Sequence, residues 1–177
     1  MPNVNEIHYR NELRTVFREP MEHIAAKATP MIDSGSAVFL SQAPLVVVAT
    51  TSEAGTDASP PGGPPGFLQV IDDGARLVFA DLSGNNRLDS YENILAHAQV
   101  GIMAMVPGAE ETVRINGRAS LSRDPELLKL TAIDSRNSPS LWMSTSASCT
   151  VGKRCDVRAS GSRRRGLSAI RCPRAVS

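Results

Sequence analysis

The sequence predicts a mainly β protein with flanking helices, folded as a small antiparallel barrel or a strongly curled sheet. Five or six short runs rich in Val, Ile, Leu and Thr are separated by turns rich in Gly and Pro. The helical patterns are few and short, and they lack the regular strand–helix alternation of a parallel α/β fold. Aromatic residues make up 4% of the 177 residues, so the core must consist mainly of aliphatic side chains.

Residues 1–40 are predicted to form an N-terminal helical segment that packs on the barrel. Apolar residues at helical spacing run through 10–28, and Pro20 divides this stretch into two short helices. A further helix is predicted over 30–40, with Thr29 as its N-cap and a proline in the first helical position.

Residues 41–134 are predicted to form the barrel. The β-branched run "LVVVATTS" (45–52) indicates a buried strand, followed by a turn and a short returning strand in "DASP". The segment "PPGGPPG" (60–66) contains too much Pro and Gly for regular structure. Two further strands flank Asp73-Gly74, a strong hairpin signal.

The second half of the barrel begins with a helix in "RLDSYENILAHA" (87–98). Two longer strands, "QVGIMAMVPG" and "ETVRINGRASLS", follow around a turn. A last short helix, "RDPELLKLTAI", has Asp124 as its N-cap and Pro125 at its first position.

Residues 135–177 differ from the rest and are predicted to form an atypical basic tail rich in Ser and Arg, without regular structure. Residues 1–135 carry 10 Lys and Arg against 17 Asp and Glu, a net charge of −7, whereas residues 136–177 carry 9 against 1, a net charge of +8. All three cysteines lie in this tail, and their spacing does not match a zinc ribbon.

Several functional classes lack their sequence signals. No apolar run approaches the 18 or so residues of a membrane span, and no charged-then-apolar leader opens the chain, so we expect a cytoplasmic protein without a membrane partner. No G-x-S-x-G, Walker, G-x-G-x-x-G or zinc motif occurs, and the three histidines are scattered, so we expect no metal site. A run of arginines can bind a phosphate backbone, but translation of a GC-rich coding sequence in a shifted frame also produces Arg, Ala, Ser and Gly. That second origin explains the tail better, so we expect no nucleic-acid partner.

The segment "SGNNRLDSYEN" is the first candidate site. Arg87 lies at or near a helix N-terminus, where free N–H groups and the helix dipole attract anions such as a phosphate monoester. Asn86, Ser83 and Ser90 could add uncharged donors. The alternative is that Asn86 caps the helix and Arg87 pairs with Asp89, with Glu92 or with solvent.

Other candidates follow from loop composition and strand alternation. Around Ser59, the segment "TDASPPGGPPGF" would bring bare backbone close to a flat ligand, unless it is an ordinary surface loop. Asp81 stands at a strand end facing the Asn-Arg turn. Arg114, Asn116 and Arg118 share one strand face, which could equally be solvated.

Three segments together resemble the FMN-binding split-barrel proteins related to pyridoxamine 5′-phosphate oxidase. They are "ATTSEAGTDASPPGGPPGFLQVIDD", "FADLSGNNRLDSYENILAHAQVGIMAMVPG" and "ETVRINGRASLSRDPELL". The resemblance covers roughly residues 10–134. It implies an antiparallel Greek-key split β-barrel, a homodimer, and FMN at the subunit interface.

The resemblance also implies which residues bind FMN. Asn86 and Arg87 would contact the phosphate, and the strand around Ala58 would lie along the isoalloxazine ring. Pro61 stands where relatives carry an arginine, which would weaken binding. No catalytic acid or base is predicted. The complete predicted cofactor-binding set is Asp57, Ala58, Ser59, Asp81, Ser83, Asn86, Arg87, Ser90, Arg114 and Asn116.

The function implied is that of an FMN-dependent flavoprotein, a flavin oxidoreductase acting on a small molecule of unspecified identity. The alternatives are a non-enzymatic module that binds flavin, deazaflavin or haem, and an inactive truncated product.

The tail is interpreted as a shifted reading frame. Residues 149–161 can be back-translated with codons that the genetic code permits. When these codons are translated from two bases later, they give His-Cys-Gly-Gln-Ala-Leu-Arg-Arg-Ala-Gly-Leu-Trp, which resembles the ending of family members. A frameshift between about residues 134 and 141 would explain the reversed charge, the cysteines and the lost periodicity. We expect it to lower stability and flavin retention.

Overall fold

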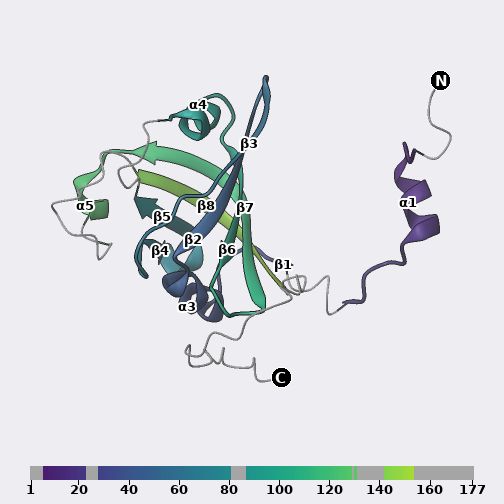
Figure 1. Ribbon diagram of the computed structural model, residues 1–177. Coiled ribbons are helices and arrows are strands. Elements are labelled where there is room, and N and C mark those ends of the chain that lie inside the picture. The colour runs from purple at the N-terminus through teal and green to yellow at the C-terminus, as the bar shows by residue number, and fades with distance from the viewer. Residues whose placement is uncertain (1–5, 23–27, 81–86, 129, 131–141, 154–177) are drawn as a thin grey trace, which may run out of the picture.

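A single antiparallel sheet dominates the computed structural model, which describes residues 6–22, 28–80, 87–128, 130 and 142–153. The strand order is β3-β2-β6-β7-β8-β5-β4, with β1 paired to β8, and the sheet curls strongly (Figure 1). The strands are β1 (Ala28–Thr29), β2 (Leu45–Ser52), β3 (Gly55–Ser59), β4 (Leu68–Ile71), β5 (Arg76–Ala80), β6 (Gln99–Met105), β7 (Glu111–Ser122) and β8 (Trp142–Lys153).

Helices flank the ends of this sheet. They are α1 (Arg10–Val16), α3 (Ser34–Gln42), α4 (Asp89–Ala96) and α5 (Pro125–Leu128), with a 3₁₀ turn η1 (Asp72–Gly74). Figure 1 shows α3 and α4 at opposite ends of the sheet.

The predicted mainly β fold with flanking helices is confirmed, as are the strand over 45–52 and the hairpin. The predicted N-cap of α5 is confirmed too, because Oδ1 of Asp124 accepts from the Glu126 N–H at 2.9 Å. No helix within the described ranges is long and apolar enough to cross a membrane.

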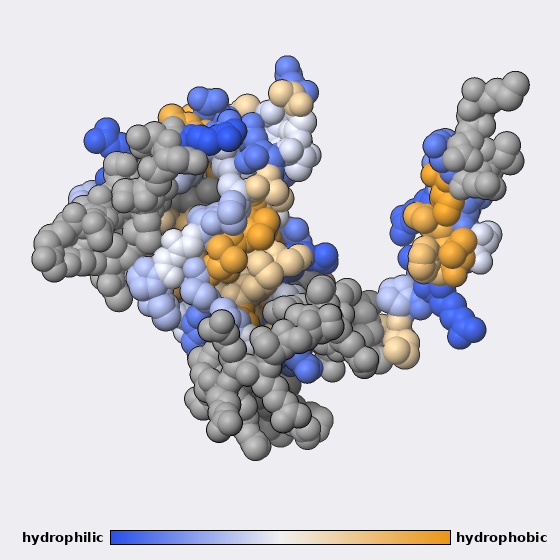
Figure 2. All heavy atoms as spheres, in the orientation of Figure 1, coloured by the Kyte–Doolittle hydropathy of each residue, from blue (hydrophilic) through white to orange (hydrophobic). Residues whose placement is uncertain are grey.

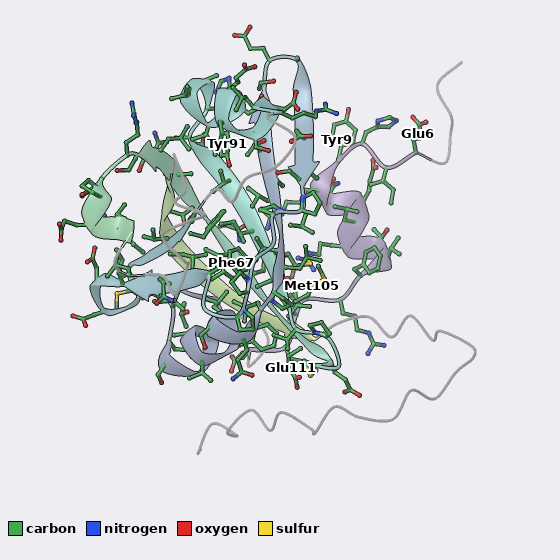
Figure 3. The ribbon with its side chains drawn as sticks, turned by 60° about the vertical axis from the view of Figure 1, so that its left-hand side comes forward. Glu6, Tyr9, Phe67, Tyr91, Met105 and Glu111 are labelled. Carbon is green, nitrogen blue, oxygen red and sulfur yellow. The ribbon has the colours of Figure 1, made fainter. Side chains whose placement is uncertain are left out.

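Strand alternation determines where the core lies. Along β2, β6 and β7 the buried side chains all fall on alternate positions, which fixes the register because a slip by one residue would expose the whole set. Phe67 and Phe79 meet edge to face, with ring centroids 6.3 Å apart, and Figure 3 shows Phe67 inside the curled sheet. The aliphatic side chains that complete the core include Leu40, Val46, Val48, Leu68, Leu77, Ile102, Ala104, Val113 and Ile115.

The start of α3 differs from the prediction. Asp33, not Thr29, is the N-cap: Oδ1 of Asp33 accepts from the Ser36 N–H at 2.8 Å and Oδ2 from the Ser36 hydroxyl at 2.9 Å. Thr29 lies in β1, and its hydroxyl donates to the Met31 carbonyl at 2.6 Å. Partial burial raises the pKa of Asp33, but hydrogen bonds led by those from Ser36 outweigh it and hold this pKa below its usual value.

The hairpin between β4 and β5 contacts the segment that leads into α3. Gly74 has φ +94°, and its carbonyl accepts from the Ile32 N–H at 2.9 Å. A Cβ at this position would lie 2.2 Å from the Ile32 carbonyl oxygen, so only glycine fits. The hairpin thereby positions residues 32–33 at the entrance of α3.

The α1 segment contacts the sheet less than expected. None of its residues is buried, and Tyr9, Leu13, Val16 and Phe17 are exposed. Figure 2 shows hydrophobic surface along this segment, which stands apart from the sheet. Residues 1–40 were predicted to pack on the barrel, and for α1 this packing stays a prediction. The second short helix expected after Pro20 falls partly on residues 23–27, outside the described part.

Strand β8 corrects the prediction that no regular structure follows residue 135. It pairs with β7 at twelve positions and with β5 at five, closing the gap between them. Backbone N–H and C=O groups make these ladders whatever the side chains, and two unpaired strand edges would otherwise remain. The rest of the tail (135–141 and 154–177) lies outside the described residues, so its shifted frame remains a prediction.

Strand β8 places a polar side chain, that of Thr145, in the core. Thr145 is fully buried, and its pairing partners Leu77 and Ala119 both belong to the hydrophobic core. Its Oγ1 atom has no hydrogen-bond partner, an uncommon state for a buried hydroxyl.

Candidate functional site

The predicted site residues divide between the two faces of the sheet. Directly opposite residues of antiparallel strands point to the same face. Asp57 lies opposite the buried Thr50, and Ser59 opposite the buried Val48, so both are on the inner side, toward α4. Ala58 alternates to the outer side, which also carries Arg114 and Asn116 on β7.

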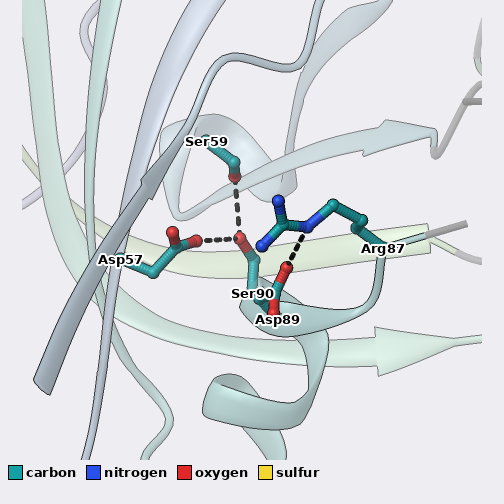
Figure 4. A network of polar contacts seen from close by, with 5 residues as sticks. All are labelled: Asp57, Ser59, Arg87, Asp89 and Ser90. Atoms are coloured by element: carbon teal, nitrogen blue, oxygen red, sulfur yellow. Dashed lines mark hydrogen bonds and ion pairs between the residues drawn. The ribbon is translucent and has the colours of Figure 1, made fainter. Parts of the chain in front are cut away.

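On the inner side, three residues form a directed hydrogen-bond chain (Figure 4). Oγ of Ser90 donates to Oδ2 of Asp57 at 3.0 Å, and the Ser59 and Ser90 hydroxyls lie 2.7 Å apart. Ser90 has one proton, and an ionised carboxylate can only accept, so Ser59 must be the donor to Ser90. The chain links strand β3 to the first turn of α4 and leaves the Ser59 oxygen as an acceptor.

Arg87 lies just before α4 and pairs with its first residue. Its Nε donates to Oδ2 of Asp89 at 2.8 Å, and the side chains are 74% and 51% exposed. This bond and the attraction to Asp89 raise the pKa of Arg87, with a further contribution from Asp57, and the same bond lowers the pKa of Asp89. The alternative in which Arg87 pairs with a neighbouring carboxylate is thus confirmed, and the partner is Asp89. The N-cap position is Leu88, so the proposal that Asn86 caps α4 is wrong.

A second contact holds α4 against the sheet. Nδ2 of Asn93 donates to Oγ1 of the buried Thr50 at 3.0 Å. Sequence reasoning missed this pair, although Asn93 follows Ser90 by three residues and so lies on the same helical face. Together the two contacts fix α4, and with it Arg87, relative to the edge strand β3.

The Pro- and Gly-rich loop folds back on the start of β2. The Val46 N–H donates to the Pro61 carbonyl at 3.0 Å, and the Gly63 N–H donates to the Pro44 carbonyl at 3.0 Å. A Cβ on Gly62 would lie 2.9 Å from the Pro44 carbonyl oxygen, so the close approach requires glycine there. Pro61 thus serves the fold through its carbonyl, which any residue would provide.

The outer side carries a shallow hollow of about 530 Å³. Its floor follows a row of paired positions, Ala49, Gly101 and Asn116, and this row continues to Ala58 on β3. Small side chains along the row leave a flat surface. The residues lining the hollow are Ala49, Thr51, Gln99, Val100, Gly101, Asn116, Gly117 and Arg118.

The remaining predicted residues are distributed as follows. Arg114 is exposed on the outer face opposite Met103, beside the hollow's lining but not part of it. Arg114, Asn116 and Arg118 share one strand face as predicted. Asp81, Ser83 and Asn86 lie outside the described residues, and their predicted contacts with the cofactor stay predictions.

Comparison with known proteins identifies a family and a fold. The family model of pyridoxamine 5′-phosphate oxidase matches residues 35–145, more than half of the chain. No curated protein sequence matches the chain.

Several solved structures share the architecture. HupZ of Group A Streptococcus is 14% identical with a TM-score of 0.51, covering 70% of this chain and 94% of HupZ. A candidate pyridoxamine 5′-phosphate oxidase from Lactobacillus delbrueckii is 20% identical with a TM-score of 0.51, covering 70% and 95%. A NimC/NimA family protein from Clostridium acetobutylicum is 14% identical with a TM-score of 0.50, covering 75% and 94%. At these identities the likeness shows the fold alone, a split β-barrel.

Proposed function

The chain belongs to the pyridoxamine 5′-phosphate oxidase family, and from that premise we propose that it is an FMN-binding flavoprotein, a flavin-dependent oxidoreductase acting on a small molecule. Bound flavin would supply the redox chemistry, while the protein supplies position and electrostatics. The observation that carries the proposal is the placement of Arg87 beside the edge strand β3, held there by the Asp57–Ser90 and Thr50–Asn93 contacts.

Arg87 is the residue we assign to the phosphate. Its planar, permanently charged guanidinium suits a phosphate monoester, and the N-terminal end of the eight-residue helix α4 adds partial positive charge. Asn86 would contribute a donor. Ser90 is less suited to donate to the phosphate than its position in the sequence suggests, because its hydroxyl proton is already donated to Asp57.

Strand β3 is the element we assign to the flavin ring. In the described part of the chain β3 has one strand neighbour, β2, so alternate N–H and C=O groups along it point away from the sheet. Those groups suit the ring edge, which carries both donors and acceptors. Ser59 offers an acceptor oxygen beside them, and the small Ala58 opens toward the hollow around Gly101.

We further propose that a second copy of the chain covers the outer face, forming a cytoplasmic homodimer. Leu45 and Met103 are 39% and 41% exposed there, and Figure 2 shows apolar side chains over the middle of the sheet. Arg114 and Asn116 would then lie at the subunit interface, where the family binds FMN.

The test is a titration of the purified 177-residue protein with FMN and with riboflavin, followed by flavin fluorescence and by absorbance after desalting. We expect FMN to bind and Arg87→Ala to weaken FMN about tenfold or more, because a charged phosphate contact is lost. Riboflavin lacks the phosphate, so its affinity should not change. Arg76→Ala, which removes an exposed arginine from the distant hairpin, is the matched control. Equal FMN affinity in Arg87→Ala and the wild type would refute the phosphate assignment.

A flavin-binding module without turnover is the second candidate. The observation that favours it is that both carboxylates near Arg87, on Asp57 and Asp89, are engaged in hydrogen bonds. Oxidation of NADH or NADPH by the FMN-loaded protein would support the oxidoreductase. Stable flavin binding without any turnover would support the module.

A further inference from the structure

Within the site just proposed, we propose that Asp89 competes with the ligand's phosphate for Arg87. The Asp89 carboxylate accepts a hydrogen bond from the Arg87 guanidinium, and a phosphate must displace it to bind. The inference rests on the proposed function, since it concerns how the same site takes up a phosphorylated flavin.

The geometry of the pair resembles a phosphate contact. The Nε–H of Arg87 points at Oδ2 of Asp89 at 2.8 Å, the distance of a charge-assisted hydrogen bond (Figure 4). A phosphate oxygen approaching the same edge of the guanidinium would need that N–H. The two anions therefore cannot both use it, and binding one weakens binding of the other.

The position of Asp89 makes it a competitor for the helix as well. It is the first residue of α4, where a carboxylate gains from the partial positive charge of the helix end. A phosphate would be attracted by the same partial charge. Asp89 thus makes both of the interactions that we assign to the phosphate, one with Arg87 and one with the helix end.

The local charge balance strengthens the effect. Asp57 is near enough to contribute to the raised pKa of Arg87, so two carboxylates share the surroundings of this one guanidinium. A phosphate dianion approaching Arg87 meets repulsion from both. Asp57 is held by Ser90 in the link between β3 and α4, whereas Asp89 has a more exposed side chain that can turn away. Asp89 is therefore the carboxylate that yields.

The test compares the wild type with Asp89→Asn, a change that keeps the side chain's size and its ability to accept from Arg87 while removing its charge. The measured quantity is the dissociation constant of FMN and of riboflavin at low ionic strength. We expect Asp89→Asn to bind FMN about two- to fivefold more tightly, the range for an exposed ion pair. Riboflavin affinity should be unchanged, because riboflavin has no group that displaces the carboxylate.

The matched control is Asp72→Asn, which removes the carboxylate from an equivalent exposed pair with Arg76 in the hairpin. It should leave both affinities unchanged. Higher salt should shrink the FMN difference between Asp89→Asn and the wild type, because screening weakens both the ion pair and the repulsion. Far-ultraviolet circular dichroism and a melting curve confirm that α4 and the fold are kept.

Two outcomes would overturn the proposal, and they are distinguishable from failure of the proposed function. Wild type that binds FMN with the same affinity as Asp89→Asn shows that no competition exists. An equal gain for FMN and riboflavin shows that Asp89 acts on the fold or on the ring instead. A wild type that binds neither flavin removes the flavin function itself, and the competition with it.

Discussion

Replacing Thr145 with valine should stabilise this protein, although the residue is fully buried in the middle of a strand. Its Oγ1 has no hydrogen-bond partner, and the residues opposite it, Leu77 and Ala119, are apolar core residues. Valine has nearly the same shape and, like threonine, is a β-branched residue that is common in strands. The change therefore removes an unsatisfied polar atom without opening a cavity.

The size of the effect follows from the cost of burying an unpaired polar group. Such a hydroxyl costs about 1–3 kcal/mol. We expect Thr145→Val to raise the free energy of unfolding by about 1–2 kcal/mol, since partial relaxation around the hydroxyl already recovers some of that cost. For a chain of this length each kcal/mol raises the melting temperature by about 2–4 °C.

Thr50→Val is a control with the same chemistry and the opposite expected sign. Thr50 is 1% exposed, but its Oγ1 accepts from Nδ2 of Asn93 at 3.0 Å. Losing that bond leaves the Asn93 amide without its acceptor, so we expect destabilisation by about 1 kcal/mol. Denaturant unfolding followed by circular dichroism and by Trp142 fluorescence measures both variants and tests two-state behaviour. Destabilisation by Thr145→Val, comparable to that by Thr50→Val, would refute the reasoning and show that the Thr145 hydroxyl is satisfied.

Three further predictions concern the fold. Gly74→Ala should destabilise by about 2–4 kcal/mol in denaturant unfolding, because its Cβ meets the Ile32 carbonyl at a positive φ; a loss below about 1 kcal/mol would contradict this. Asp33→Ala should cost about 1 kcal/mol at pH 7 through the lost cap. The folded pKa of Asp33 lies below its unfolded value, so the wild type's advantage is complete above about pH 4 and disappears as the pH falls through the folded pKa; an advantage that did not decline at all on acidification below about pH 4 would argue against the cap. Restoring the other reading frame over residues 136–177 should raise both the melting temperature and the flavin retained after desalting; identical values for the two proteins would contradict the expected loss of stability and flavin retention.

Local patterns in the sequence predicted most of the elements. The β-branched run over 45–52 identified β2, and two longer apolar runs around a turn identified β6 and β7, whereas their alternating buried faces were seen only in the structure. Asp73-Gly74 identified the hairpin, and Asp124 the start of α5. These signals depend on neighbours within a few residues, so no knowledge of the rest of the chain was needed.

The misplaced elements are those whose structure depends on distant partners. Strand β8 carries no recognisable pattern, yet it forms because β5 and β7 both leave an edge to be paired. The N-cap of α3 was predicted at Thr29 but is Asp33, because the Gly74 carbonyl accepts from the Ile32 N–H and fixes the chain just before the helix. Local sequence propensity contains no information about unpaired strand edges or about a contact with a distant hairpin.

Residue type and local pattern were enough to predict the fold class, the order of the elements from α3 to α5 and the residue types that suit a phosphate at the start of α4. The tertiary structure alone decided that Asp57 and Ser59 meet Ser90 on the inner side of β3, while Ala58, Arg114 and Asn116 belong to the outer face. It also decided that Arg87 is already paired with Asp89. The reason is physical: residue type and spacing specify what a side chain can bind, but strand register and the packing of α4 specify which partner is within reach.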